Sequence, residues 1–440
     1  MRAALLLFGV LMAGCSGGLL GRSYSLDHQH RADLHATLRG MVVHRDGALV
    51  ARYPLIDLDT LRLSPNGGHL VFAARAGSGW RVVVDGRVLG RPWDAVLPGS
   101  LRLSDGGQLS FVARRGALLF VVHAGAAPAE VAEGPYDGVT ALQVDEEGAH
   151  HGYVARRGAL AFVVLDGREL GPHEAVAELK LGPRGGRWAA IVRRDGRWWV
   201  LHDGGAAPHD SAAGLRFCPR GEHLYYVARD GGRERVIAAS RPEAPPGPPF
   251  AKVEWRTLQA AASDEKTGPL YVAQSAEDRF LVHGGTTGPP YDSIRSPRVS
   301  ERRSAYLGRR GDKEQAVIDG RPGPWYDEVA DPVIADGAGA DSDSGYAYLG
   351  RRGGDLFLVL PGRELPLRWA LAGSLALCPD GSHVGLLGGV AAHALQLLVD
   401  GRPVREFEAE EPEEVRRVWG ARGLQRWVAA ALPCAAAPAK

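Results

Sequence analysis

Short apolar runs, separated by glycine, proline and aspartate, recur along most of this chain. One stretch runs from Leu61-Arg-Leu-Ser-Pro-Asn-Gly-Gly through the apolar segment 70–74 to Val82-Val-Val-Asp-Gly-Arg. Alternating apolar and polar positions, and short apolar runs between turn signals, predict β-strands. Since helical periodicity is almost absent from the sequence, the pattern predicts an all-β protein.

The runs belong to a unit that recurs with a period of about forty residues. Each unit holds four short runs, which predicts a four-stranded antiparallel meander. A repeated sheet of this length buries its faces only against its neighbours, as the blades of a β-propeller do. Well-preserved units open at Leu61, Leu101, Leu142, Leu179, Leu215 and Leu375, and weaker openings near Leu258, Val299 and Val333 keep the register.

Turn motifs punctuate the units. Ser-Pro-Asn-Gly follows the first run, where proline presets φ and glycine tolerates positive φ. An Arg-Gly turn separates the second run from the third, and Asp-Gly-Arg follows the third. A Pro-aromatic-Asp motif marks the outer strand, an edge on which proline is tolerated. Because a catalytic group is needed only once, the recurrence of these motifs favours a structural role for them.

The two ends of the repeat region look like complementary half units. Residues 41–56 resemble the second half of a unit, and residues 415–432 resemble a first half. We therefore expect about ten units, with the N- and C-terminal strands sharing one blade. Such a number fits either one large ring or two smaller rings.

With these openings and turns, the repeats resemble the WD-like, S-P-D-G class of β-propeller found in the Tol-system periplasmic protein and in many bacterial lipoproteins. The resemblance covers nearly the whole chain after residue 35. It implies a β-propeller fold over residues 36–433, followed by a disordered tail at 434–440. It does not imply a particular function, because this scaffold serves docking, enzyme gating and ligand binding alike.

The first residues carry a targeting signal. Arg2 precedes the apolar run 3–13, and Met12-Ala13-Gly14-Cys15 resembles a lipobox. The resemblance implies a signal peptide at 1–14 that is cleaved before Cys15, whose thiol is then lipidated. The alternative is an ordinary secretory signal. Residues 15–35 are interpreted as the lipidated cysteine and a flexible tether.

The anchor sets the expected location. Ser16 follows the cysteine where enterobacterial inner-membrane lipoproteins carry aspartate. By that analogy we expect a lipid-anchored protein of the cell envelope, at the outer membrane and facing the periplasm or the surface. The membrane would be contacted through the lipid anchor, because no later apolar stretch is long enough to span a bilayer.

Composition narrows the function classes. The 52 Lys and Arg residues nearly balance the 51 Asp and Glu residues, which gives no argument for nucleic-acid binding. The sequence has no H-E-x-x-H motif, no G-x-S-x-G motif and no glycine-rich phosphate loop. Hydrolase and nucleotide-binding functions therefore lack their usual motifs, and no cofactor is expected.

The remaining cysteines need separate interpretations. Cys218 and Cys378 stand where sister units carry Ser64 and Ser104, so we expect small buried side chains there. Cys434 lies in an Ala/Pro-rich tail, where it is either free or paired between chains.

Two sets of residues are candidate sites. The acidic run with Asp336, Asp341 and Asp343 could wrap a hard cation, although it lacks the closing glutamate of an EF-hand, and a solvated insertion is the alternative. The Arg-Gly turns are expected to emerge on one face as a basic collar for an acidic partner, the alternative being turn residues with a cancelled field. The collar comprises Arg114, Arg115, Arg156, Arg157, Arg193, Arg194, Arg309, Arg310, Arg351 and Arg352.

Two functions fit these observations. The first is a non-catalytic scaffold, held in the envelope by its lipid, that docks a protein or an envelope polymer. The second is a lyase- or hydrolase-type enzyme whose residues meet in the propeller channel from different blades. Unrepeated His, Asp, Glu or Tyr side chains in the channel would favour the enzyme.

Overall fold

In the computed structural model, ten antiparallel sheets follow one another along the described part of the chain. The fold class predicted from the sequence, all-β with about ten four-stranded units, is therefore confirmed. The chain divides into two compact units, residues 1–224 and 225–440, which are described separately. The structure describes residues 18–25, 29–125, 130–184, 186–240, 246–260, 268–300, 303–335, 345–371, 373–389, 395–407, 425, 428–429 and 431–434.

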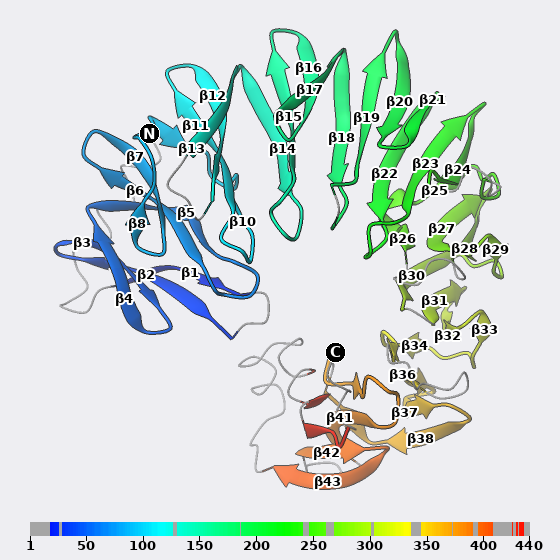
Figure 1. The fold of residues 1–440 in the computed structure, drawn as a ribbon. Coiled ribbons are helices and arrows are strands. Elements are labelled where there is room, and N and C mark those ends of the chain that lie inside the picture. The colour runs from blue at the N-terminus through cyan, green and yellow to red at the C-terminus, as the bar shows by residue number, and fades with distance from the viewer. Residues whose placement is uncertain are drawn as a thin grey trace. The chain divides into compact units, whose positions relative to one another are not determined.

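The first unit contains sheets 1 to 5 (Figure 1). Sheet 1 has β1 (Leu19–Tyr24), β2 (Arg31–Thr37), β3 (Gly40–Arg45) and β4 (Ala48–Tyr53), and sheet 2 has β5 (Leu55–Leu63), β6 (Leu70–Ala76), β7 (Gly79–Val84) and β8 (Arg87–Val88). Sheet 3 has β9 (Ala95–Val96), β10 (Arg102–Leu103), β11 (Leu109–Arg115), β12 (Leu118–Ala124) and β13 (Glu130–Tyr136). Sheet 4 has β14 (Gly138–Val144), β15 (His151–Arg157), β16 (Leu160–Leu165) and β17 (Arg168–His173), and sheet 5 has β18 (Ala175–Leu181), β19 (Trp188–Arg194), β20 (Arg197–His202) and β21 (Gly205–His209).

Sheet 6 comprises β22 (Ser211–Phe217), β23 (Leu224–Asp230) and β24 (Arg233–Ala238), and the boundary between the units falls in β23. Sheet 7 has β25 (Lys252–Val253), η1 (Trp255–Thr257), β26 (Gln259–Ala260), β27 (Pro269–Ser275), β28 (Asp278–His283) and β29 (Thr286–Thr287). Sheet 8 has β30 (Ser293–Val299), β31 (Ser304–Arg310), β32 (Lys313–Ile318) and β33 (Arg321–Pro322). Sheet 9 has β34 (Glu328–Val329), β35 (Val333–Ile334), β36 (Tyr346–Arg352), β37 (Asp355–Leu360) and β38 (Arg363–Leu367), and sheet 10 has β39 (Trp369–Ala370), β40 (Ala376–Leu377), β41 (Val384–Gly389), β42 (Leu395–Val399) and β43 (Arg402–Phe407).

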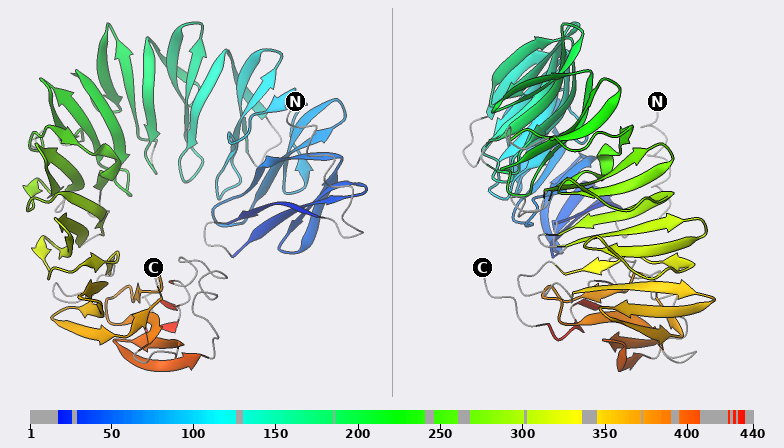
Figure 2. Two further views of the ribbon diagram at one scale, coloured as in Figure 1. Left: turned by 180° about the vertical axis from the view of Figure 1, so that it is seen from behind. Right: turned by 90° about the vertical axis from the view of Figure 1, so that its right-hand side faces the viewer.

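Neighbouring sheets of the first unit pack face to face, as the two views in Figure 2 show for the blue to green strands. Alternation along a strand sends successive side chains to opposite neighbours. In β6, Phe72 packs in the core shared with sheet 1, whereas Val71 and Ala73 pack in the core shared with sheet 3. The seam between sheets 3 and 4, and the seam between sheets 4 and 5, hold separate cores of the same kind. Each sheet is thus stabilised by its sequence neighbours.

The second unit repeats this plan. Tyr271 packs between sheets 6 and 7, Tyr306 between sheets 7 and 8, and Tyr348 between sheets 8 and 9. All three tyrosines come from the second strand of a sheet and are nearly fully buried. Burial of such large side chains is the main stabilising contribution at these seams.

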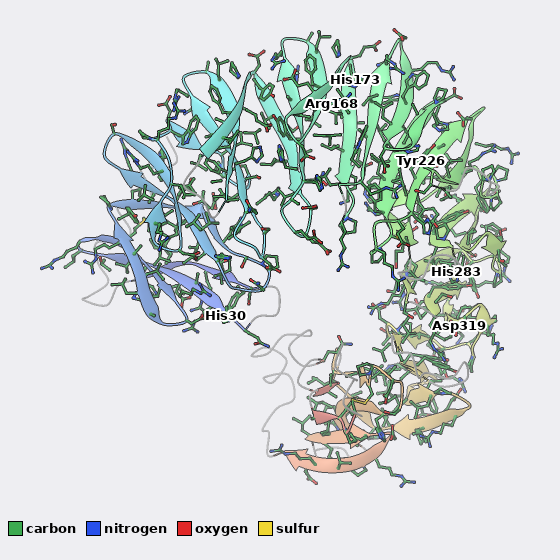
Figure 3. All side chains as sticks on the ribbon, viewed as in Figure 1. His30, Arg168, His173, Tyr226, His283 and Asp319 are labelled. Carbon is green, nitrogen blue, oxygen red and sulfur yellow. A yellow bond between two sulfur atoms is a disulfide. The ribbon has the colours of Figure 1, made fainter. Side chains whose placement is uncertain are left out.

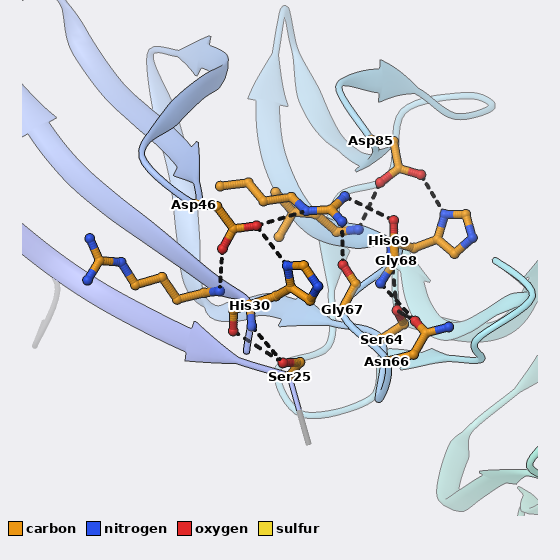
Figure 4. A network of polar contacts seen from close by, with 12 residues as sticks. Ser25, His30, Asp46, Ser64, Asn66, Gly67, Gly68, His69 and Asp85 are labelled. Atoms are coloured by element: carbon orange, nitrogen blue, oxygen red, sulfur yellow. Dashed lines mark hydrogen bonds and ion pairs between the residues drawn. The ribbon is translucent and has the colours of Figure 1, made fainter. Parts of the chain in front are cut away.

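The Asp-Gly turn acts as a clamp at one end of a sheet. In sheet 2, Asp85 adopts a positive φ of 49° in the turn after β7. One carboxylate oxygen accepts the Leu70 backbone N–H at 2.9 Å, and the other lies 2.7 Å from His69 Nδ1. The same pair recurs in sheet 1 as His30 with Asp46, and Figure 4 shows both. The turn aspartate therefore fixes the start of the second strand, which explains its recurrence.

The N-terminal segment that was predicted to be half a unit belongs to a full four-stranded sheet, so the prediction of a flexible tether before it is wrong. Strand β1 and most of β2 lie in segment 15–35, interpreted above as a flexible tether, and the two strands complete the sheet of β3 and β4. Ala32 and Leu34 alternate into the core, and Arg22 and Arg31 pair with Asp33 on the other face. These contacts stabilise residues 19–24 and 31–35 as strands. Sheet 1 takes all four of its strands from residues 19–53, and the described residues 425, 428–429 and 431 are helical, so the prediction that N- and C-terminal strands share one blade is wrong.

The C-terminal segment covers sheet 10 instead. Its described residues 425, 428–429 and 431 are helical, and Val428 and Leu432 pack on Leu387 and Leu397 of the sheet. Cys378 and Cys434 form a disulfide, with 5.5 Å between their Cα atoms. Cys378 is therefore more than a small buried side chain, and Cys434 is neither free nor paired between chains.

Cys218 behaves as the repeat predicts. It is buried, it is a free thiol, and its Sγ accepts the His223 backbone N–H at 3.3 Å. In sheet 2, Ser64 Oγ accepts the equivalent N–H of His69 at 3.0 Å. Among the described residues, no helix is long and apolar enough to cross a membrane.

Candidate functional site

The Arg-Gly turns are bound to the Pro-aromatic-Asp motifs of the preceding sheets. The Arg115 guanidinium lies 4.4 Å from the Trp93 ring, and Asp94 Oδ2 accepts the Gly116 N–H at 2.6 Å. The same acceptor contact is made to Gly158 by Asp137, to Gly311 by Asp292 and to Gly353 by Asp327. The second arginine of the turn also stacks in other sheets: Arg157 on Tyr136, Arg194 on Trp199 and Arg352 on Tyr326. Arg310 instead donates to the Pro290 carbonyl oxygen at 3.0 Å. Four of the ten collar arginines therefore have a structural role as stacking partners, and Arg310 as a hydrogen-bond donor.

The first arginine of each turn is differently placed. These side chains are exposed at the end of the second strand of each sheet. Arg193 lies 3.4 Å from Glu174, whereas Arg114, Arg156, Arg309 and Arg351 form no ion pair with a carboxylate in the described ranges. In sheets 4 and 9 the second arginine also pairs with a glutamate, Arg157 with Glu169 at 2.6 Å and Arg352 with Glu364 at 3.1 Å. Two carboxylates therefore accompany the two arginines of these turns and largely offset their field.

Four other predicted positions cannot be placed. Cys15 of the lipobox lies outside the described residues. The acidic run of Asp336, Asp341 and Asp343 does so too, so its interpretation as a cation site stays a prediction.

A cluster of His123, Glu133 and His151 lies in the seam between sheets 3 and 4. His123 comes from β12, Glu133 from the outer strand β13, and His151 from β15 of the next sheet. His123 lies two residues after Val121, and His151 two residues before Tyr153, so both share the face of the seam core. Their side chains are each about one sixth exposed, at 17% for His123 and 18% for His151. The cluster thus lies at the partly solvated margin of the core.

Three nitrogen and oxygen atoms converge in this cluster. His151 Nε2 lies 3.1 Å from Glu133 Oε1, and His123 Nε2 lies 3.5 Å from the same oxygen. All three ligand atoms lie within 4.8 Å of one another. The two imidazole rings are 3.7 Å apart between their centroids. This is a donor set that transition-metal ions such as zinc prefer.

The opposite atoms of these side chains have polar partners. Ser110 Oγ lies 2.8 Å from His123 Nδ1, and Asp166 Oδ1 lies 3.4 Å from His151 Nδ1. The Tyr153 hydroxyl donates to Glu133 Oε2 at 2.7 Å. Each of the three side chains is therefore held in its orientation by a polar contact on the atom that faces away from the cluster.

The electrostatics favour an ionised glutamate. Burial alone would raise the pKa of Glu133, but contacts from His123, His151 and Tyr153 outweigh it and hold the pKa far below its ordinary value of 4.5. Burial and hydrogen bonding also raise the pKa of the Tyr153 hydroxyl, which therefore stays protonated as a donor.

A groove of about 620 Å³ adjoins the cluster on the side of sheet 5. His151 contributes to its wall, together with Trp188 of β19 and with Arg168 and His173 of β17. Arg168 and His173 are labelled in Figure 3. Burial and the nearby Arg194 lower the pKa of His173. Of the three cluster residues, only His151 lines this groove.

The sequence analysis did not single out this cluster. The cluster can be recognised by comparing equivalent strand positions in neighbouring seams. The pair equivalent to His123 and His151 is Val84 with Leu109 between sheets 2 and 3, and Leu165 with Trp188 between sheets 4 and 5. Glu133 likewise stands where sheet 4 has Leu170. Three ionisable residues at apolar positions of a repeat are recognisable only once the strand pairing is known.

No family model matches the chain, and no curated protein matches it either. Solved structures are similar in fold. A structure described as the eukaryotic initiation factor has 11% identity, covering 72% of this chain and 89% of the other, with a TM-score of 0.40. TolB from Acinetobacter baumannii has 13% identity, covering 51% and 52%, with a TM-score of 0.25. The β-propeller domain of the Trilobed protease from Pyrococcus furiosus has 11% identity, covering 62% and 97%, with a TM-score of 0.31.

Proposed function

We propose that this chain is a non-catalytic binding scaffold, anchored in the cell envelope through lipidated Cys15, that docks an acidic protein or envelope polymer on its Arg-Gly turns. The observation that carries the proposal is the division of labour within each turn. Both arginines of these turns are exposed, but Arg115 and Arg157 stack on aromatic side chains. Arg114 and Arg156 form no ion pair with a described carboxylate.

The first arginines recur at the same strand position in successive sheets. Arg114 stands opposite Leu119 in sheet 3, Arg156 opposite Ala161 in sheet 4. A row of like charges with fixed spacing favours an extended anionic partner over a single small anion, because each charge adds a separate weak contact. The expected binding is therefore salt-dependent and cumulative.

Two features support a location outside the cytoplasm. The lipobox-like Met12-Ala13-Gly14-Cys15 precedes the first strand. The Cys378–Cys434 disulfide is a bond that persists in oxidising compartments, such as a bacterial periplasm. An outer-membrane position facing the periplasm or the surface agrees with both features.

Binding of poly-L-glutamate to the full chain tests the scaffold proposal. Arg114→Ser/Arg156→Ser is expected to weaken binding about fivefold at low salt, from about 0.5 kcal/mol per lost charge contact. The control Arg87→Ser/Arg168→Ser removes two exposed arginines from the Asp-Gly-Arg turns at the opposite ends of sheets. Equal affinities of the two double variants, or affinity unaffected by salt, would contradict a docking row on the Arg-Gly turns.

A further inference from the structure

We propose that His123, Glu133 and His151 form a binding site for one zinc-type divalent transition-metal ion, which joins sheets 3 and 4 at their seam. Two ligands come from β12 and β13 of sheet 3 and the third from β15 of sheet 4. The site is independent of the docking row on the Arg-Gly turns.

Two of the three ligand-atom separations are close to those around a tetrahedral ion, and the third, between the two histidines, is within 4.8 Å. Zinc lies about 2.0–2.2 Å from imidazole nitrogen and carboxylate oxygen, which places neighbouring ligands about 3.3–3.6 Å apart. Glu133 Oε1 lies 3.1 Å from His151 Nε2 and 3.5 Å from His123 Nε2. Small side-chain rotations would suffice to bring the atoms around one ion. Three protein ligands leave one position for water or another small ligand.

Polar groups next to the non-ligating atoms favour the form of each histidine in which the proton is on Nδ1 and Nε2 is free to bind a metal ion. A carboxylate at Nδ1 of a metal-binding histidine holds the proton there and leaves Nε2 as the ligand atom. Asp166 is placed to do this for His151, and Ser110 Oγ can accept the Nδ1 proton of His123. Tyr153 occupies only Oε2 of Glu133, so Oε1 remains directed at the histidines.

Polar side chains in this seam also lower the stability of the fold relative to the apolar side chains of the flanking seams. In the flanking seams, the equivalent positions are apolar, with Val84 against Leu109 and Leu165 against Trp188. His123 Nε2 is buried, and its only polar partner among the described residues is Glu133 Oε1 at 3.5 Å, too far for a good hydrogen bond. Burying an unpaired polar atom is unfavourable, and a metal bond to that atom would remove the penalty.

Zinc binding to the full chain, first stripped with a chelator, tests this site. We expect one equivalent bound, and a melting temperature raised by about 3 °C when free zinc is a hundredfold above Kd. His151→Gln and Glu133→Gln should each weaken binding at least about a hundredfold. Tyr153→Phe keeps all three ligands and should weaken it about tenfold, which identifies Tyr153 as a positioning residue.

His69→Gln is the matched control, because His69 also pairs with a turn aspartate but has no second histidine beside it. It should bind zinc like the unchanged chain. Circular dichroism of the metal-free variants separates lost ligands from lost folding, and using two ligand variants keeps the test valid if one of them unfolds. No bound equivalent, or binding retained in both His151→Gln and Glu133→Gln, would overturn the proposal and leave adventitious surface binding only.

Discussion

At the scale of single residues, the repeat conserves interactions rather than identities. Asp85, Asp166 and Asp400 all have φ between 48° and 51° and all accept the first backbone N–H of the second strand. Aspartate is favoured there because it tolerates this conformation and supplies the acceptor. The second oxygen of each of these aspartates contacts the residue just before the strand, which is a histidine in all three sheets. In sheet 8 the corresponding aspartate, Asp319, contacts Arg303 instead.

The clamp predicts a pH-dependent stability. The hydrogen bond to Asp166 raises the pKa of His150 above its ordinary 6.5. A raised pKa in the folded state means that the contribution is fully present below pH 6.5 and is lost as the pH rises through the folded pKa. His150→Ala should therefore reduce the free energy of unfolding at pH 5.5 by about 0.5 kcal/mol, and less at pH 8.5, since both side chains are over one third exposed. Urea unfolding at the two pH values measures this, and an equal loss at both would exclude the ionic clamp.

At the scale of the element, the Arg-Gly turn and the Pro-aromatic-Asp motif form one unit across consecutive sheets. The sequence analysis recognised both motifs and their structural role, because their recurrence separates them from single-use chemistry. It did not recognise that they contact each other, since the contact joins residues such as Trp93 and Arg115 from adjacent repeats. The seam cluster was missed for the same reason: strand register is set by pairing, not by motif.

The turn contact has a measurable energy. Asp292 Oδ2 accepts the Gly311 N–H at 2.7 Å, so Asp292→Ala should lower the free energy of unfolding by about 1 kcal/mol. Asp312→Ala removes a neighbouring exposed carboxylate that forms no described hydrogen bond or ion pair, and should change stability by less than about 0.5 kcal/mol. Urea denaturation compares the two variants. Equal losses would mean that the carboxylate acts through general charge rather than through this hydrogen bond.

At the scale of the whole molecule, composition and repeat length were sufficient to predict ten sheets, but not how the repeat begins and ends. The segment before residue 36 is polar enough to suggest a tether. The alternation at Ala32 and Leu34, and the pair of His30 with Asp46, nevertheless make strands β1 and β2 the first half of sheet 1. At the other end, Cys378 and Cys434 are 56 residues apart, and spacing alone did not reveal their disulfide.

The disulfide should stabilise sheet 10 locally. Cys434→Ser opens a loop of 56 residues and is expected to cost about 2–4 kcal/mol, through the greater freedom of the unfolded chain. Hydrogen exchange of the β41 amides reports this as faster exchange. Cys218→Ser is the control, because serine stands at the equivalent position in sheets 2 and 3 and Cys218 has no covalent partner. If the β41 amides exchange equally fast in both variants, the bond does not hold the C-terminal segment on this sheet.

The account depends on one distinction: residues that recur build the sheets, and the unrepeated cluster of His123, Glu133 and His151 serves a separate purpose. A crystal structure of the full chain grown with zinc, with anomalous diffraction recorded on both sides of the zinc edge, tests that distinction most directly. The account predicts one strong peak within bonding distance of His123 Nε2, His151 Nε2 and Glu133 Oε1. Peaks confined to the repeated His-Asp clamps, with none at this seam, would contradict it.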